Sequence, residues 1–405
     1  MALFLFEATD AQGGVHKDKI EAMDRHEALI LLAKKQLTPY FLEEEGKIKG
    51  GLNLNSGLFE RIKPIDRITL VRNLAVTIKA GLNIIEAVQI LIVDTNKKIL
   101  KNILLDAKSS LERGQPLSAT FAKYNKYFSP VFSGLIEAGE ASGHLDKALE
   151  QLGNQVDKEY KLVRKVRSAL AYPAILLVAS IIVILILLVF VLPRLSRSFE
   201  LSGAELPGIT RAILAVSNAV RNNIIMDLVI VGSIFALTSY FRKSPRGRQI
   251  FLNFAMKIPV LSELIKKVAL VRFTRNLSTL IGSGINIIDA LQLSSQTTGN
   301  DLYKHRIVAS IAEIKNGIAL SDTLKNETKL FPHLLVNMIA VGEKTGTLEY
   351  VLKTFSDFYD EEVDASLKDL TTYLEPIMLL FMGVVIGTIA LSVLLPIYQL
   401  VGKFT

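Results

Sequence analysis

The chain has 405 residues, of which half are apolar, and it has a formal net charge of +8 and no cysteine. The lack of cysteine excludes disulfides, thiolate chemistry and cysteine-ligated metals. Such a large apolar share beside 21% charged residues is typical of a membrane protein and unusual for a soluble one. The positive charge fits a membrane surface that carries anionic lipid better than it fits specific nucleic-acid binding.

Residues 1–45 are predicted to form a small β-β-α-β module. An apolar extended stretch at Leu3–Phe6 is followed by a glycine turn and a second extended stretch, and a helix is expected to begin at Asp24. A last extended piece covers Tyr40–Leu42. Residues 46–65, which are rich in glycine, asparagine and lysine, are predicted to be a flexible linker.

The next segment, residues 66–170, is predicted to be an all-α bundle because its apolar residues recur at helical spacing and strand-like alternation is nearly absent. Gly81 is placed to end the first helix in the left-handed conformation. Asn83 and Glu86 have the spacing of an N-cap and its third-position acid. A long helix that begins near Leu145 is predicted to run towards the membrane.

Three apolar segments, at residues 171–193, 223–241 and 374–401, are predicted to cross the membrane. The uncharged runs Ser168–Pro193 and Pro376–Gly402, which hold the first segment and all but the start of the third, are longer than the roughly 20 residues that span a bilayer. The shorter second segment needs Asp227 to reach the interface. Residues 194–222 are expected to be an external loop. Basic residues gather beside these segments, which predicts an anchor to anionic lipid; they are Lys158, Lys161, Arg164, Lys165, Arg167, Arg242, Lys243, Arg246 and Arg248.

The chain is a tandem duplication. Residues Arg72 to Pro193 return as Arg275 to Pro396, shifted by a constant 203 positions with no insertion or deletion, so residues 242–373 are predicted to form a second bundle like the first. Equivalent pairs that hold the same residue in both copies are Arg72 and Arg275, Gly81 and Gly284, Gly139 and Gly342, Glu140 and Glu343, Gly143 and Gly346, Pro173 and Pro376, and Pro193 and Pro396.

The unrepeated apolar segment at residues 223–241 determines on which side of the membrane the second bundle is expected to lie. If the first bundle lies inside and its anchor crosses outward, a second copy attached directly to that anchor would begin outside. A further crossing returns the chain, so both bundles are expected on the cytoplasmic side. The first 45 residues lack a charged start followed by an apolar block, so no secretory signal is predicted and the N-terminus is expected in the cytoplasm.

No catalytic constellation is found in the sequence. Gly342-Glu343-Lys344-Thr345 lacks the upstream glycine and the Gly-Lys-Ser/Thr order of a phosphate-binding loop. Gly282-Ser283-Gly284 has two of the glycines of a dinucleotide fingerprint but sits between helices. The five histidines show no metal-ligand spacing. The sequence thus gives no positive sign of an enzyme, and it shows no cofactor site and no metal-ligand spacing.

The best shared polar motif has two interpretations. It runs from Gly139-Glu140 to Gly143 and returns from Gly342-Glu343 to Gly346. The favoured interpretation is a helix-helix corner, in which the glycines supply backbone freedom and the glutamate caps the following helix. The alternative makes the glutamate a contact for a partner protein or a metal ligand.

Two further groups of charges also have a structural and a functional interpretation, and a third has one expected place. For Arg72 and Arg275, an ion pair within each bundle is favoured over a docking charge. The acidic run from Asp357 to Asp364 is read first as a solvated helix face and second as a surface for a basic partner. Glu375 is expected to lie at the membrane interface beside Pro376, which is expected to open the first turn of a helix.

The stretch from Arg167 through Ala171-Tyr172-Pro173, followed by an apolar segment that closes at Val191-Leu192-Pro193, resembles the signature of the type II secretion protein F and type IV pilus assembly protein C family. The resemblance covers nearly the whole chain, including both Gly-Glu-x-x-Gly-x-Leu corners. The second copy departs from it because Glu375 stands where the first copy has Tyr172.

This resemblance implies an inner-membrane platform for a pilus or pseudopilus, without chemistry of its own. Its expected partners are a cytoplasmic hexameric ATPase, pilins or pseudopilins, other inner-membrane assembly proteins, membrane lipid and further copies of itself. A transporter or channel built from repeats is the alternative, although such proteins place polar or broken helices at the bilayer midplane, and Ile175–Leu192 contains a single serine and no charge. A signalling receptor ranks last because no output domain is recognisable.

Overall fold

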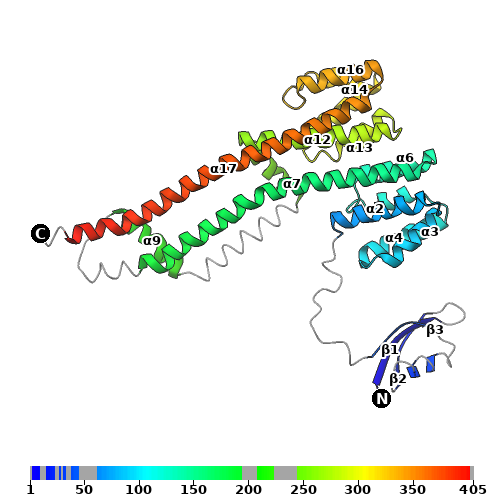
Figure 1. Cartoon of the computed structure of the whole chain (residues 1–405), viewed down its shortest axis with the longest axis horizontal. Helices are drawn as coiled ribbons and strands as arrows, with labels where there is room; N and C mark the ends of the chain where they lie inside the picture. Colours follow the sequence, from blue (N-terminus) through cyan, green and yellow to red (C-terminus); the bar gives the residue numbers. More distant parts are fainter. Residues whose placement is uncertain are drawn as a thin grey trace. The chain divides into compact units, whose positions relative to one another are not determined.

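The structure is a computed structural model that divides the chain into two compact units, Met1–Arg61 and Ile62–Thr405 (Figure 1). Each unit is described by itself. The described residues are 2–9, 15–22, 27–28, 31–32, 38–44, 62–193, 208–222 and 244–401. The membrane segment expected at residues 223–241 lies outside this part of the chain, as does nearly all of the expected linker.

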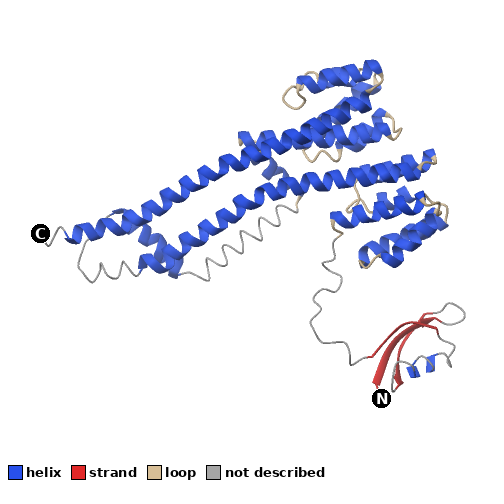
Figure 2. Ribbon diagram, in the orientation of Figure 1, coloured by secondary structure: helices blue, strands red, loops and turns tan. Residues whose placement is uncertain are grey.

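The first unit contains a three-stranded antiparallel sheet in the order β2-β1-β3, with strands β1 (Ala2–Thr9), β2 (Val15–Ala22) and β3 (Thr38–Glu44). Phe4 of the central strand pairs with Ile20 on one side and Glu44 on the other. Among the described residues these are the only strands, as Figure 2 shows in red. Between β2 and β3, residues 27–28 and 31–32 are helical, and Ala28 and Leu32 are fully buried.

The first repeat is all helical, as its period predicts. Its helices end where the sequence indicates, because Gly81 and Gly114 both adopt left-handed backbone conformations, with φ of 92° and 75°. Its first helix begins at Pro64, slightly before the expected start at residue 66, because proline suits the first turn. The helices are α2 (Pro64–Lys79), α3 (Ile84–Asp94), α4 (Lys98–Glu112), α5 (Leu117–Lys123), α6 (Pro130–Ser142) and α7 (Leu145–Ile186).

The second repeat reproduces the first at the same offset. Helices α4 and α6 map onto α14 and α16 without a shift at either end. The N-cap is also reproduced, because the Asn83 side chain accepts a hydrogen bond from Glu86 N–H, as Asn286 does from Asp289 N–H, at 2.9 and 3.0 Å. The helices of this repeat are α12 (Pro259–Gly282), α13 (Ile287–Ser295), α14 (Asp301–Lys315), α15 (Leu320–Leu324), α16 (His333–Thr345) and α17 (Leu348–Val401), preceded by α11 (Pro245–Ala255).

One continuous apolar core extends through both repeats. In the first repeat, Phe121, Phe128 and Phe132 stack edge-on or tilted against one another. The repeats meet at Gly134 of α6, where an added Cβ would lie 2.6 Å from a methyl group of Leu293 in α13. The two bundles are therefore packed as one body.

Each repeat continues without a break into an apolar helix (Figure 1). Among the described residues, the two helices long and apolar enough to cross a membrane are Leu145–Val191, which includes the π-helical turn η1 (Leu187–Val191), and Leu348–Ser392. Their large apolar side chains point outward. Ile175 is 69% exposed and Leu380 is 70% exposed, as expected for surfaces that face lipid.

The prediction that Pro376 opens a helix is wrong. Pro376 lies inside α17, and its counterpart Pro173 lies inside α7. Both helices begin more than 25 residues before the proline, where they pack in the bundle, so the helix is already formed when it reaches the proline. Proline is tolerated inside long apolar helices of membrane proteins. Glu375 is an exposed residue of the same helix.

Residues 194–222 were expected to be a loop, but 208–222 form helix α9 (Gly208–Asn222). Leu214 packs with Leu192 and Ile389, at the ends of the two apolar helices. The Thr210 hydroxyl donates to the Ser392 carbonyl at 2.8 Å, and the Ser217 hydroxyl donates to the Leu188 carbonyl. The signal for this helix was present at helical spacing, but the polar residues between its apolar positions resembled a connection.

Candidate functional site

The duplicated corners of the two repeats have the same hydrogen bonds. The Glu140 carboxylate accepts from the backbone N–H groups of Leu117 and Ser118, at 2.5 and 3.2 Å, and from the Ser118 hydroxyl at 2.6 Å. Glu343 accepts from the equivalent N–H groups of Leu320 and Ser321, at 2.7 and 3.1 Å. Each glutamate thus satisfies orphan donors at the start of a short helix, α5 or α15.

The expected role of this glutamate as a cap for the following helix is therefore wrong. It caps the helix that lies more than 20 positions earlier in the chain. Sequence spacing could not reveal this contact, because it depends on how α6 packs on α5. The glycines act as expected: Gly143 and Gly346 end α6 and α16 with φ of 71° and 72°.

Replacing Glu140 by alanine is expected to destabilise the protein by about 1–2 kcal/mol, because two N–H donors of α5 lose their acceptor. Glu343→Ala should have an effect of similar size. Glu140→Gln retains one acceptor oxygen and should recover part of the loss. Denaturant unfolding of the detergent-solubilised chain measures all three, and an unchanged midpoint for both alanine variants would contradict the capping role.

Arg72 and Arg275 each form an ion pair with an equivalent aspartate in their own repeat, at 3.3 Å to Asp157 and 3.4 Å to Asp360. The favoured interpretation of these arginines is thus present in the structure. Their surroundings differ, because the Arg72 side chain is 58% exposed and that of Arg275 is 5% exposed. Arg275 also donates through Nε to the Ser356 hydroxyl at 3.2 Å.

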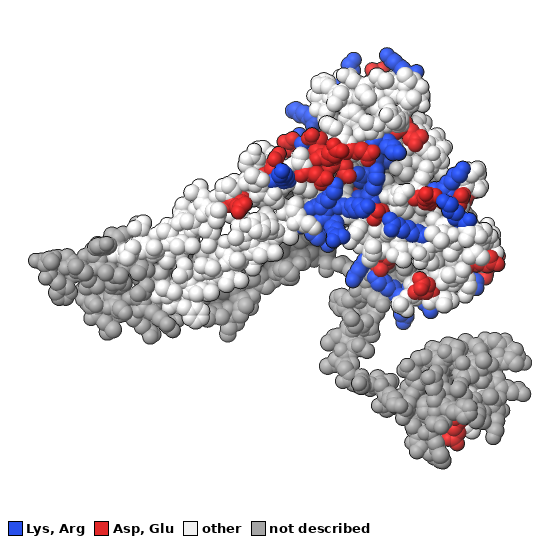
Figure 3. All heavy atoms as spheres, in the orientation of Figure 1, with Lys and Arg blue, Asp and Glu red and all other residues white. Residues whose placement is uncertain are grey.

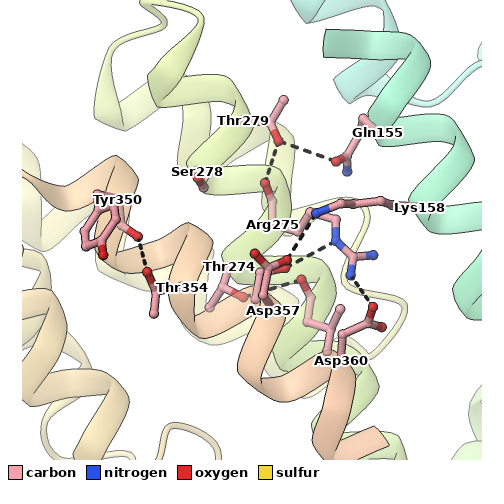
Figure 4. Close-up of polar contacts among 12 residues, drawn as sticks. Gln155, Lys158, Thr274, Arg275, Ser278, Thr279, Tyr350, Thr354, Asp357 and Asp360 are labelled. Carbon is pink, nitrogen blue, oxygen red and sulfur yellow. Dashed lines mark hydrogen bonds and ion pairs between the residues drawn. The ribbon is translucent and has the colours of Figure 1, made fainter. Parts of the chain in front are cut away.

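Arg275 is buried because α7 of the first repeat packs over α12 and α17 of the second. We call this contact the seam. Basic residues of α7 meet acidic residues of α17: Lys158 lies 3.1 Å from Asp357, and Lys165 lies 2.7 Å from Asp364 and 3.8 Å from Asp360. Acidic and basic side chains adjoin on this face of the bundles (Figure 3), and Figure 4 shows Lys158 and Arg275 reaching towards Asp357 and Asp360.

Beneath these ion pairs the seam contains buried polar contacts. The Gln155 side-chain amide of α7 donates to the Asn276 side-chain oxygen of α12, and the Thr279 hydroxyl donates to Gln155 at 3.4 Å (Figure 4). On the other side of α7, Glu159 accepts from the Arg272 guanidinium at 2.6 and 3.0 Å. Such partnered polar groups favour one register of the two repeats over others.

The acidic run from Asp357 to Asp364 was expected to be a solvated face, and Asp357 and Asp364 are indeed about half exposed, at 53% and 49%. They also pair with basic residues of the first repeat, as does Asp360, which is 30% exposed. The basic surface that they meet belongs to the same chain. Lys158, Lys161 and Lys165 are all in ion pairs, but their side chains are still 47%, 65% and 39% exposed, so the lipid anchor stays a prediction. Sequence alone could not show the pairs between the repeats, because partners about 200 positions apart leave no local signal.

Another ion pair ties α12 to α17 beside the seam. Lys267 lies 2.9 Å from Glu362 and 3.0 Å from Glu263. Burial alone would lower the pKa of Lys267, but the hydrogen bonds to Glu362 and Glu263 outweigh it and raise that pKa above its ordinary value of 10.5. A raised lysine pKa means that the contribution to stability is fully present below pH 10.5 and is lost only above it. The contact is therefore intact at neutral pH.

An apolar groove of about 620 Å³ lies beside the seam, where α7 leaves the bundle. Leu162, Val166 and Leu170 of α7 form one wall, Leu264 and Val268 of α12 form the other, and Arg167 lies at its edge. It adjoins the start of the apolar part of α7, because Ala171 and Ala174 also line it.

The remaining motif residues take structural positions. Gly284 repeats the positive φ of Gly81, at 82°. Tyr172 is 54% exposed on α7, Pro193 is buried, and Pro396 lies in the last turns of α17. In the described part of the chain, no cluster of three or more histidine, aspartate or glutamate side chains could hold a metal ion. The corner residues are recognisable in the sequence, whereas the partners that make the seam are not.

Comparison with known proteins also finds two copies of one unit in the chain. The model of the family "Type II secretion system (T2SS), protein F" matches residues 70–193 and again residues 273–396. Each match covers most of one bundle together with the apolar helix that continues from it. The chain is 33% identical over 408 residues, and over the full length of both chains, to a type IV pilus assembly protein PilC from Thermus thermophilus. It is 34% identical to the PilC protein of Myxococcus xanthus, over 99% of this chain and 95% of the relative. It is also 29% identical to a type II secretion system protein F from Pseudomonas aeruginosa, over 99% of this chain and the whole relative.

Proposed function

Because the chain belongs to the type II secretion system protein F family, whose members are inner-membrane platforms for type II secretion or type IV pilus assembly, we propose that it couples a cytoplasmic assembly ATPase to the polymerisation of pilins or pseudopilins. The observation that carries this proposal is that each bundle continues into its apolar helix without a break, in α7 and α17. A bundle displaced by an ATPase would move the membrane end of the same helix.

The topology that fits this role has three membrane helices, with the N-terminus and both bundles on the cytoplasmic side. It rests on α7, α17 and the unrepeated apolar segment at residues 223–241. In this division of the chain, residues 1–45 are a small α+β module, 46–65 a linker and 194–222 an external connection that includes α9. The two repeats then occupy residues 66–170 and 242–373.

The partners follow from the same arrangement. Both bundles would present a pseudo-symmetric surface to the ATPase, and the family corners around Gly139 and Gly342 would hold that surface in shape. The groove beside Arg167 offers an apolar surface close to the membrane, where the hydrophobic helix of a pilin would bind. Other inner-membrane assembly proteins and lipid would contact the apolar helices.

The apolar helices themselves argue against a transporter or channel. The single serine of the first apolar segment, Ser180, donates its hydroxyl to the Leu176 carbonyl of its own helix at 2.8 Å. In α17, Thr388 and Ser392 likewise bond to carbonyls of their own helix. These hydroxyls are satisfied locally, so they do not form the midplane polar site of a transporter.

Deleting both bundles while keeping the apolar helices is expected to abolish fibre assembly and co-purification with the assembly ATPase, because the apolar helices alone would have no cytoplasmic contact. Membrane insertion of the shortened chain, checked by fractionation, is the control. Normal fibres from an inserted shortened chain would overturn the proposal, and substrate flux through the reconstituted full chain would favour the transporter.

A further inference from the structure

The seam joins different faces of the two repeats. The first repeat contributes one face of α7, which we call the docking face and which contains Gln155, Lys158 and Lys165. The second repeat contributes the surface between α12 and α17, which we call the receiving face and which contains Thr279, Arg275, Asp357 and Asp360. A contact between unlike faces is heterologous, so it leaves one face of each kind unused.

The duplication identifies the two unused faces by the 203-residue shift. The unused docking face lies on α17 and contains Phe358, Glu361 and Lys368, which correspond to Gln155, Lys158 and Lys165. The unused receiving face lies between α2 and α7 of the first repeat and contains Arg72, Val76, Asn154 and Asp157, which correspond to Arg275, Thr279, Asp357 and Asp360.

Both unused faces are open in the single chain. Phe358 is 45% exposed and Val76 is 66% exposed. The Arg72 side chain is 58% exposed, whereas the equivalent arginine under the seam is 5% exposed. The equivalent surface of the other repeat is covered by the seam, whereas these large apolar side chains are exposed beside charged groups. Such an exposed surface indicates that a partner binds there.

The residues on the two unused faces have changed in matched ways. Within the chain, Gln155 bonds to Thr279 and Asn276; at the equivalent contact, Phe358 would meet Val76 and Asn73, so the Gln155 and Thr279 positions have both become apolar while the asparagine is kept. The Lys165 contact with Asp360 is kept, as Lys368 with Asp157.

The remaining charges change in a matched way as well. Within the chain, Lys158 pairs with Asp357 and the neighbouring Arg275 pairs with Asp360 (Figure 4). In the equivalent contact, the acid at Asp357 is replaced by the neutral Asn154, and the lysine is replaced by the acid Glu361, which would lie beside Arg72. A carboxylate thus remains next to the arginine, although it comes from the other face.

We infer that these two faces bind each other between two copies of the chain, with α17 of one copy on the α2–α7 surface of the next, as α7 lies on α12 and α17 within one copy. Asp364 corresponds to Lys161, which would lie near Lys368. The ion pair between Lys165 and Asp364 therefore has no equivalent. The same holds for two other ion pairs, because Lys158 with Asp357 corresponds to Glu361 with Asn154, and Arg272 with Glu159 corresponds to Thr69 with Glu362. The contact between copies is therefore weaker than the seam and reversible. Repetition of a heterologous contact closes into a ring when the rotation allows it.

The lack of cysteine makes a crosslinking test direct, because every introduced thiol is unique. Full-length Val76→Cys and Phe358→Cys chains, carrying different tags, are co-expressed, and their membranes are oxidised or treated with a short thiol-reactive crosslinker. The expected product is a dimer that contains one chain of each kind. Each variant expressed alone should give no such dimer, because unlike faces are required.

Two controls match this pair. Gln155→Cys with Thr279→Cys in one chain, at the equivalent positions of the seam, should crosslink within the chain, so that both free thiols are lost while the chain still migrates as a monomer. Leu105→Cys, exposed on α4, with Phe358→Cys should give several-fold less dimer and reports random collisions.

Absence of the mixed dimer while the seam control reacts would overturn the inference, and so would like-with-like dimers from the single variants. Both new cysteines are exposed, so misfolding does not confuse the result. The crosslink scores contact between chains and not fibre assembly, and it can therefore fail or succeed independently of the ATPase coupling proposed above.

Discussion

Asp360→Ala is expected to destabilise the chain by about 3 kcal/mol, because it leaves the buried guanidinium of Arg275 without its counter-charge. Arg275 is 5% exposed, and its two terminal nitrogens have no hydrogen-bond partner among the described residues, so the 3.4 Å ion pair compensates its charge. Asp360 itself is 30% exposed, so the expected cost lies at the low end of the range for breaking a buried ion pair. Unfolding of the detergent-solubilised chain by denaturant measures the loss.

The duplication supplies a control for this variant at the same place in the first repeat. Asp157→Ala removes the same carboxylate from Arg72, which is 58% exposed and regains water. Its expected cost is within about 1 kcal/mol. Equal losses from the two variants would show that the seam does not bury Arg275.

Gly342→Ala is expected to cost about 2 kcal/mol, because the new methyl group has no space. An added Cβ would lie 2.9 Å from the Leu348 Cα and 3.3 Å from its backbone nitrogen, so the start of α17 would have to move. Gly139→Ala should behave similarly, since its Cβ would lie 2.4 Å from that of Ala148 at the other corner. The midpoint of thermal or denaturant unfolding reports both losses.

The matched control is Gly387→Ala, in the apolar part of α17. An added Cβ there has nothing within 4 Å, and alanine favours a helix. No loss of stability is expected from this change. A loss at Gly387 as large as that at Gly342 would mean that close packing at the corners is not the reason for these glycines.

The helical repeats could be predicted from the sequence because the signals that start and end a helix act within a few residues. The constant shift then showed that the same helices occur twice. Gly81, Gly143 and Gly346 end their helices, and Asn83 caps the next one, through contacts with neighbours in the chain. The amphipathic period identifies the faces that form the core. These features could be read from the sequence because their physics is local.

The seam could not be predicted in this way. Arg72 and Arg275 have equivalent positions and equivalent partners, yet one is exposed and the other is buried, because the asymmetry arises only when one repeat packs on the other. The cap by Glu140 is also missed for lack of a local signal, since its acceptor and donors lie on different helices. Pro376 was misplaced because proline prefers the first turn of a helix, whereas here the residues before it are already helical.

In the proposed mechanism, motion of the bundles reaches the membrane through the continuous helices α7 and α17. The most direct test inserts a short flexible glycine-serine segment into α7 after Val166, between the bundle and Pro173, with the same insertion after Gly51, in the expected linker, as the control. We predict that the α7 variant still co-purifies with the assembly ATPase but assembles no fibres, while the control assembles fibres normally. Normal fibre assembly by the α7 variant would contradict the account.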